Sequence, residues 1–174
     1  MKPIKNPVKV IYISLLLSAI LVMTSCERNK EDPFYVGTWE FKDKVYSGDL
    51  TFNTTRTLIL TINTYQEVYA IQLDNSPTIS SILGVKGDLA VSGNKMTFNM
   101  NAVGECVKDA QNKCTSNVEW FAKGTPTYNT YIQFIRESFT GEYDADEDYL
   151  WLVRDMNNDG DSDDTGEDIE FERK

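Results

Sequence analysis

The 174-residue sequence contains no histidine. Histidine is the commonest general base of enzymes and the commonest protein ligand of zinc, so its absence argues against Ser-His or Cys-His catalysis and against a zinc centre. Basic residues are also scarce, with 17 Lys and Arg against 27 Asp and Glu and a net charge of −10. An acidic surface repels the phosphate backbone of nucleic acids. We therefore expect no nucleic-acid partner and no enzymatic activity.

The N-terminal apolar run is too short to cross a bilayer. It covers residues 10–23, broken only by Ser14 and Ser18, and it follows three lysines without an acidic residue. As a helix it would reach about 21 Å, short of a hydrocarbon core of about 30 Å. A basic stretch, a short apolar stretch and small residues in this order are typical of a secretory signal peptide.

The end of this segment resembles the lipobox of bacterial lipoproteins, in which small residues precede an invariant cysteine. Residues 21–26 read Leu-Val-Met-Thr-Ser-Cys, with Met23 where leucine is usual. The resemblance implies that residues 1–25 are a lipoprotein signal peptide. It also implies that Cys26 is lipidated with acyl chains such as palmitate and anchors the protein in outer-membrane lipid. Residues 26–33 then form a lipidated N-terminus and a charged, solvated tether.

The tether carries a short acidic signal. Lys30, Glu31 and Asp32 resemble the export tags of surface lipoproteins in the Bacteroidetes. We therefore expect an outer-membrane lipoprotein exposed at the cell surface, with the periplasmic face of the outer membrane as the alternative. Without the signal peptide, 14 basic residues remain against 27 acidic ones, which gives a net charge of −13.

Two cysteines remain in the exported part of the chain, Cys106 and Cys114. Exported proteins meet oxidising surroundings, so this pair predicts one disulfide. It would close a polar loop of nine residues and contribute about 2–3 kcal/mol to stability.

Residues 34–174 predict an all-β domain. Sustained helical periodicity is absent, and short alternating apolar and polar runs recur between Gly, Asn, Asp and Ser residues. These runs are residues 38–42, 57–62, 68–73, 88–91, 95–100, 149–153 and 168–172. Such a pattern indicates an antiparallel, up-and-down meander. Residues 128–139 fit a strand or a short helix, and the spacing of their apolar residues slightly favours the helix.

One hairpin pattern occurs twice, at residues 87–98 and 141–152. Both copies read Gly, acidic, apolar, any, apolar, then four residues, then apolar, any, apolar. The residues in the middle favour tight turns, so each copy predicts two strands joined by a short connection.

The first predicted strand opens with Gly37-Thr38-Trp39, which resembles the Gly-x-Trp start of lipocalin-like proteins, and most closely the bacterial lipocalin-like lipoproteins. In that family an arginine near the last strand stacks on the tryptophan ring, and Arg173 is the matching position. The resemblance implies a lipocalin-like barrel or half-barrel over residues 34–174. It also implies that this domain holds a small hydrophobic ligand.

Inward-facing side chains of the strands would line that ligand. The candidates are Leu60, Tyr69, Ile71, Phe98 and Trp151. An eight-stranded barrel, however, has room for one small ligand or for none. The alternative is a packed barrel that acts through its surface, as an adhesion protein or a subunit of an envelope complex.

The most acidic segment is a candidate calcium site. Seven acidic residues and no basic one lie between Asp155 and Asp168. The spacing matches the first half of a calcium loop, with Gly160 at the sharp turn. The ligands would be Asp155, Asn157, Asp159, Asp161 and Asp163. Gly166 stands where the loop should end in a bidentate glutamate, and no helices flank it. Oxygen ligands of this kind suit Ca²⁺, so calcium would order the hairpin; a solvated hairpin tip without metal is the alternative.

Overall fold

The computed structural model describes residues 32–155, 162 and 167–174. The predicted signal peptide and Cys26 lie outside these described residues. Residues Pro33–Lys174 belong to one compact unit. None of the helices within the described part of the chain is long and apolar enough to cross a membrane.

This unit is built almost entirely of strands. The strands are β1 (Gly37–Ser47), β2 (Leu50–Leu60), β3 (Thr64–Leu73), β4 (Ile79–Ser92), β5 (Lys95–Lys108), β6 (Cys114–Ala122), β7 (Ser138–Ala145), β8 (Tyr149–Arg154) and β9 (Asp168–Arg173), and the helix α2 (Pro126–Tyr131) lies between β6 and β7. The prediction of an all-β domain with one short helix is confirmed.

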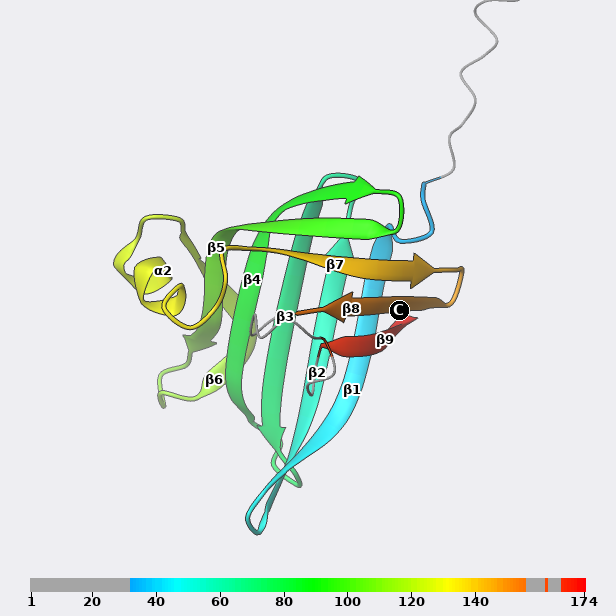
Figure 1. Ribbon diagram of the computed structural model, residues 1–174. Coiled ribbons are helices and arrows are strands. Elements are labelled where there is room, and N and C mark those ends of the chain that lie inside the picture. Colours follow the sequence, from blue (N-terminus) through cyan, green and yellow to red (C-terminus); the bar gives the residue numbers. More distant parts are fainter. Residues whose placement is uncertain (1–31, 156–161, 163–166) are drawn as a thin grey trace, which may run out of the picture. The chain divides into compact units, whose positions relative to one another are not determined.

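The strands form a closed barrel of antiparallel pairs (Figure 1). The ring runs β4-β3-β2-β1-β9-β8-β7-β5, and pairing of β4 with β5 closes it. The predicted meander is therefore a full barrel rather than a half-barrel. Strand β6 stands outside this ring. It pairs with the second half of β5, beyond the point where β7 leaves that strand.

The two ends of the barrel differ. The short strands β7, β8 and β9 complete only one end, called the floor here, and β9 pairs with β1 only at Trp39 and Glu40. The longer strands β1–β5 continue past them toward the opposite end, called the open end here, where β6 and α2 lie (Figure 1).

The floor is filled by a continuous apolar core. Alternation along each strand sends every second side chain inward, as the buried Met96, Phe98 and Met100 of β5 illustrate. The core cluster contains Tyr35, Trp39, Leu58, Leu60, Tyr65, Leu89, Met96, Phe98, Leu150, Leu152, Ile169 and Phe171. These side chains are buried almost completely, so the floor is packed.

Both predicted hairpins are confirmed, and they lie side by side. Strands β4 and β5 are joined at Gly93, whose φ of 61° suits glycine, and β7 and β8 are joined at residues 146–148. Lys95 at the start of β5 is in register with Glu142 of β7. The repeated pattern in the sequence thus builds two neighbouring hairpins that turn at the floor.

The helix α2 is shorter than predicted. It starts at Pro126, with Thr125 as the N-cap whose hydroxyl accepts a hydrogen bond from the Tyr128 N–H at 3.3 Å. The helix ends at Tyr131. Residues 132–137 of the predicted helix form turns and bends, and the residues from Ser138 onward pair with β5 as strand β7.

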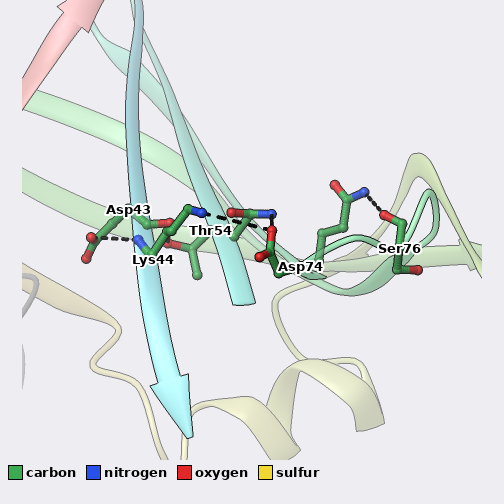
Figure 2. A network of polar contacts seen from close by, with 7 residues as sticks. Asp43, Lys44, Thr54, Asp74 and Ser76 are labelled. Carbon is green, nitrogen blue, oxygen red and sulfur yellow. Dashed lines mark hydrogen bonds and ion pairs between the residues drawn. The ribbon is translucent and has the colours of Figure 1, made fainter. Parts of the chain in front are cut away.

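Polar contacts hold the strand ends at the open end together (Figure 2). The Asn53 amide donates to Asp74 Oδ1 at 3.0 Å, and Lys44 Nζ lies 4.0 Å from the same oxygen. The Thr54 hydroxyl donates to the backbone carbonyl of Asp43 at 3.2 Å. These contacts connect β1, β2 and the turn after β3 beyond the reach of β8 and β9.

The Trp39–Arg173 stack predicted from the lipocalin resemblance is present. The guanidinium carbon of Arg173 lies 4.2 Å from the ring centroid of the buried Trp39. Arg173 also donates to the carbonyl oxygens of Phe34, at 2.6 Å, and Val36, at 3.2 Å. A Cβ atom on Gly37 would lie 2.6 Å from Arg173 Nη1, which explains the glycine. The Arg173 side chain therefore joins β1, β9 and the segment that precedes β1.

Replacing Arg173 with lysine tests this closure. Arg173→Lys keeps the charge but loses the planar group that stacks on Trp39 and donates at fixed angles. We expect the free energy of unfolding to fall by about 1–2 kcal/mol in urea denaturation. The matched control is Lys174→Arg, because the exposed side chain of Lys174 forms an ion pair with Glu40 that arginine can keep. Equal effects of the two substitutions would contradict the closing role of the stack.

Candidate functional site

A buried ion pair crosses the interior of the barrel. Arg154 of β8 donates to Glu67 of β3 through Nη1 at 2.7 Å and through Nη2 at 3.1 Å. The Arg154 side chain is fully buried and that of Glu67 nearly so. Strands β3 and β8 are four places apart in either direction around the ring of eight. The pair therefore links opposite walls.

The surroundings of the pair keep Glu67 ionised. Arg154 lies against the aromatic rings of Phe139, at 5.5 Å, and Phe98, at 5.9 Å. Arg56 Nη1 lies 3.9 Å from Glu67 Oε1. Burial by itself would raise the pKa of Glu67, but the charge and hydrogen bonds of Arg154, helped by Arg56, outweigh it and lower that pKa.

A cavity of about 110 Å³ lies beside this ion pair, inside the wall formed by β2–β5 and β7. Its lining residues are Arg56, Tyr65, Glu67, Tyr69, Leu83, Val85, Met100, Ile135, Arg136 and Phe139. Most of the wall is apolar, and a few polar groups interrupt it. Such a combination is typical of small-molecule sites, although this cavity is small for one.

Tyr65 contributes a hydroxyl to this wall that lacks a hydrogen-bond partner among the residues the structure describes. The side chain is 2% exposed. Burial, with the Glu67 charge nearby, raises the pKa of Tyr65, so the hydroxyl keeps its proton. Leaving such a group without a partner costs about 1–3 kcal/mol, which makes this position a natural place for a ligand atom or a water molecule.

The segment after α2 covers the cavity. Ile135 and the exposed Arg136 belong to its wall, and Arg136 Nη1 donates to the Asp155 carbonyl at 3.5 Å. The helix itself is anchored by Tyr128, whose hydroxyl donates to Glu137 at 2.9 Å. Burial, with this contact, raises the pKa of Tyr128 to about 12. The cover is therefore held in place by polar contacts at both ends.

Of the five residues predicted to line a ligand, one is on the cavity wall. This residue is Tyr69. Ile71 follows on the same face of β3 but lies beyond the cavity, toward the open end. Leu60 and Phe98 are buried in the packed floor, where they fill space that a ligand would need.

Trp151 was expected to face inward, and this prediction is wrong. Its side chain is 41% exposed on the outer face, where Nε1 donates to Asp168 at 2.6 Å. Strand β8 places Leu150 and Leu152 inward instead, and alternation then turns the residue between them outward.

The polar residues of the interior were missed from the sequence. Glu67 and Arg56 occupy inward positions, and both continue the alternation of the buried Tyr65 and Leu58. Extending the apolar alternation across charged residues would have placed both of them inside. Arg154 likewise continues the alternation of Leu150 and Leu152 on β8, so opposite charges at inward positions of β3 and β8 are the signal that could have found the ion pair.

The predicted calcium site cannot be assembled from the described residues. Asp155 is described, and its carbonyl accepts the hydrogen bond from Arg136. The other four candidates, Asn157, Asp159, Asp161 and Asp163, lie outside the described residues. In the rest of the chain that the structure describes, no group of three or more acidic or cysteine side chains could hold a metal. Calcium binding stays a prediction.

The two cysteines are joined as predicted. Cys106 of β5 and Cys114 of β6 have Cα atoms 5.3 Å apart. Both pack with Ile82 and Val118 in a separate apolar cluster between β4, β5 and β6. The disulfide therefore fastens β6 to the barrel and does not reach the cavity.

Comparison of the sequence with protein-family models finds no match, and comparison with curated proteins finds none either. The class of the protein is thus defined by its fold alone, a closed antiparallel barrel of eight strands that fits a lipocalin-like architecture. Its function has to be argued from the cavity and from the N-terminal sequence.

Removing the Glu67 charge tests the ion pair. Glu67→Gln leaves Arg154 buried without its counter-charge, and we expect a loss of about 3–5 kcal/mol at pH 7. Because folding lowers the pKa of Glu67, its contribution is present above the ordinary value of 4.5 and is lost as the pH falls below it. The stability difference from the wild type should therefore shrink in acid.

Urea denaturation at several pH values measures this difference. Glu142→Gln is the matched control, since Glu142 and Lys95 form an exposed pair at 3.7 Å. The control should lose less than about 1 kcal/mol. A loss at Glu67 that is as small as the control's, or that does not change with pH, would contradict the role given to the pair.

Proposed function

We propose that this chain is a lipid-anchored binding protein of the outer membrane whose barrel holds a small hydrophobic ligand and performs no catalysis. The observation that carries the proposal is the cavity of about 110 Å³ inside the closed barrel. Barrels of eight strands can hold one small ligand when side chains do not fill them completely.

The size of the cavity sets the size of the buried part of the ligand. An apolar cavity of about 150 Å³ in another protein stays dry and binds benzene. The cavity in this barrel is smaller, at about 110 Å³, so the buried part of the ligand is no larger than one ring or a short branched chain. Any longer portion has to leave past Ile135 and Arg136, because the floor is packed.

The location rests on the N-terminal sequence. The lipobox-like residues 21–26 support lipidation of Cys26, and residues 30–32 favour export to the cell surface. A lipid anchor on a short charged tether would keep the barrel close to the membrane. A membrane-associated barrel of this kind can take up or hand over small apolar molecules that dissolve poorly in water.

The anchor is tested by substitution of its cysteine. In cells that express the full chain, Cys26→Ala should abolish incorporation of a palmitate analogue and move the protein out of the membrane fraction. Ser25→Ala keeps a small residue before the cysteine and serves as the control. Unchanged labelling and fractionation of the Cys26 variant would refute the lipid anchor.

The ligand is tested by native mass spectrometry of the mature chain, made without lipid by Cys26→Ser. We expect a small apolar molecule to co-purify and to be lost on denaturation. Val85→Phe, which places a larger side chain in the cavity wall, should lower its occupancy at least fivefold. Val45→Phe is the control, because Val45 is 40% exposed.

A bare protein mass, or equal occupancy in both valine variants, would contradict the carrier function. Such a result would support the alternative, a packed barrel that acts through its surface as an adhesion protein or envelope-complex subunit.

A further inference from the structure

We propose that the cavity selects a small organic acid, with an apolar ring or short branched chain against Leu83, Val85 and Met100 and a carboxylate that meets Tyr65 and Arg56. This inference rests on the proposed function and specifies the chemistry of its ligand. It follows from which polar groups line the cavity and from what each of them already contacts.

The polar wall of the cavity consists mainly of hydrogen-bond donors. Arg56 and Arg136 present guanidinium groups, which donate and never accept, and Tyr65 presents a hydroxyl. Among the residues that the structure describes, Glu67 is the carboxylate on this wall, and each of its oxygens accepts a hydrogen bond from Arg154. A ligand oxygen that accepts hydrogen bonds therefore meets the Tyr65 hydroxyl and positive charge, whereas a ligand ammonium group meets a carboxylate that is already engaged.

Tyr65 fixes where the ligand oxygen would sit. Its ring packs edge-on against Phe98, with centroids 5.0 Å apart and an interplanar angle of 89°. The hydroxyl is buried on the cavity wall and has no partner among the described residues. Because the ring is held in place, the hydroxyl position is preset, and an acceptor atom of the ligand would supply the missing hydrogen bond.

Arg56 provides the charge for an acid. Its guanidinium lies over the Tyr69 ring at 5.1 Å from the centroid, and its Nη1 is 3.9 Å from Glu67 Oε1. Burial lowers the pKa of Arg56, so a second negative charge beside it would stabilise its charged form.

Of the described charged groups near the cavity, Asp88 also brings negative charge toward Tyr65, and its carboxylate accepts a hydrogen bond from the Asn101 amide at 2.9 Å. Arg154 is directed at Glu67, and Arg136 at the cover adds a second positive charge to the wall. Glu105 is in register with Leu83, but its carboxylate accepts a hydrogen bond from Tyr131 at 2.8 Å. The exported chain has a net charge of −13, so its surface repels anions in general. Binding of an anion would therefore report a specific site.

Four probes of similar size test whether the cavity prefers an acid to a neutral or a basic ligand. Benzoate, benzamide, toluene and benzylamine share a ring and differ in charge and hydrogen bonding. We would measure their affinities for the mature chain, carrying Cys26→Ser, by ligand-observed NMR. Benzoate should bind at least tenfold more tightly than benzylamine and several-fold more tightly than toluene or benzamide.

Tyr65→Phe removes only the hydroxyl. It should lower the affinity for benzoate at least fivefold and leave the affinity for toluene unchanged. Tyr46→Phe is the control, because Tyr46 is 72% exposed. A melting temperature no lower than that of the wild type, with an unchanged near-ultraviolet circular dichroism spectrum, would verify that the Tyr65 variant keeps its fold.

The outcomes distinguish this inference from the proposed function. Toluene or benzylamine binding as tightly as benzoate would overturn the selection of an acid and leave a cavity for apolar ligands. Benzoate binding that Tyr65→Phe does not change would place the anion elsewhere and overturn the inference as well. No binding of any probe would reject both the inference and the carrier function.

Discussion

The ion pair between Glu67 and Arg154 is the constraint on which the interior of the barrel depends. Two charges leave water only when geometry and hydrogen bonding offset the desolvation cost, and here a two-pronged contact joins opposite strands of the ring. The pair can form only when β3 and β8 face each other across a closed barrel. The small cavity, walled partly by Glu67 itself, lies beside the pair and adjoins the packed floor at Tyr65, which belongs to both.

The stack of Arg173 on Trp39 closes the floor of the barrel. Trp39 fills the base of the barrel, and Arg173 covers its ring while it binds the segment that leads into β1. Because this end is sealed, access to the cavity is restricted to the side covered by Ile135 and Arg136. The disulfide fastens β6 near the open end, and Tyr128 anchors α2 beside it. The contact that seals the barrel thus lies at the floor, and the segment that covers the cavity lies toward the open end.

The sequence predicted what local periodicity and turn chemistry determine. It predicted the strands, both hairpins, the Cys106–Cys114 pair and the stacking of Arg173 on Trp39. It did not predict that β6 lies outside the ring. Local sequence patterns do not indicate that β6 and β7 pair with the same strand, β5. It also misplaced Trp151, since an apolar residue was assumed to face inward. For the same reason the charged interior was missed: a polar residue in an alternating run looks exposed until the partner that neutralises it is known.

The division of the interior can be tested with methyl NMR of the protein labelled at Leu, Val and Met, on addition of benzoate. We predict shifts at the cavity wall, at Leu83, Val85 and Met100, and none at the floor residues Leu60 and Leu150. Shifts at the floor methyls as large as those at the wall, or shifts at neither, would contradict a barrel with a packed floor and, beside its buried ion pair, a cavity for an organic acid.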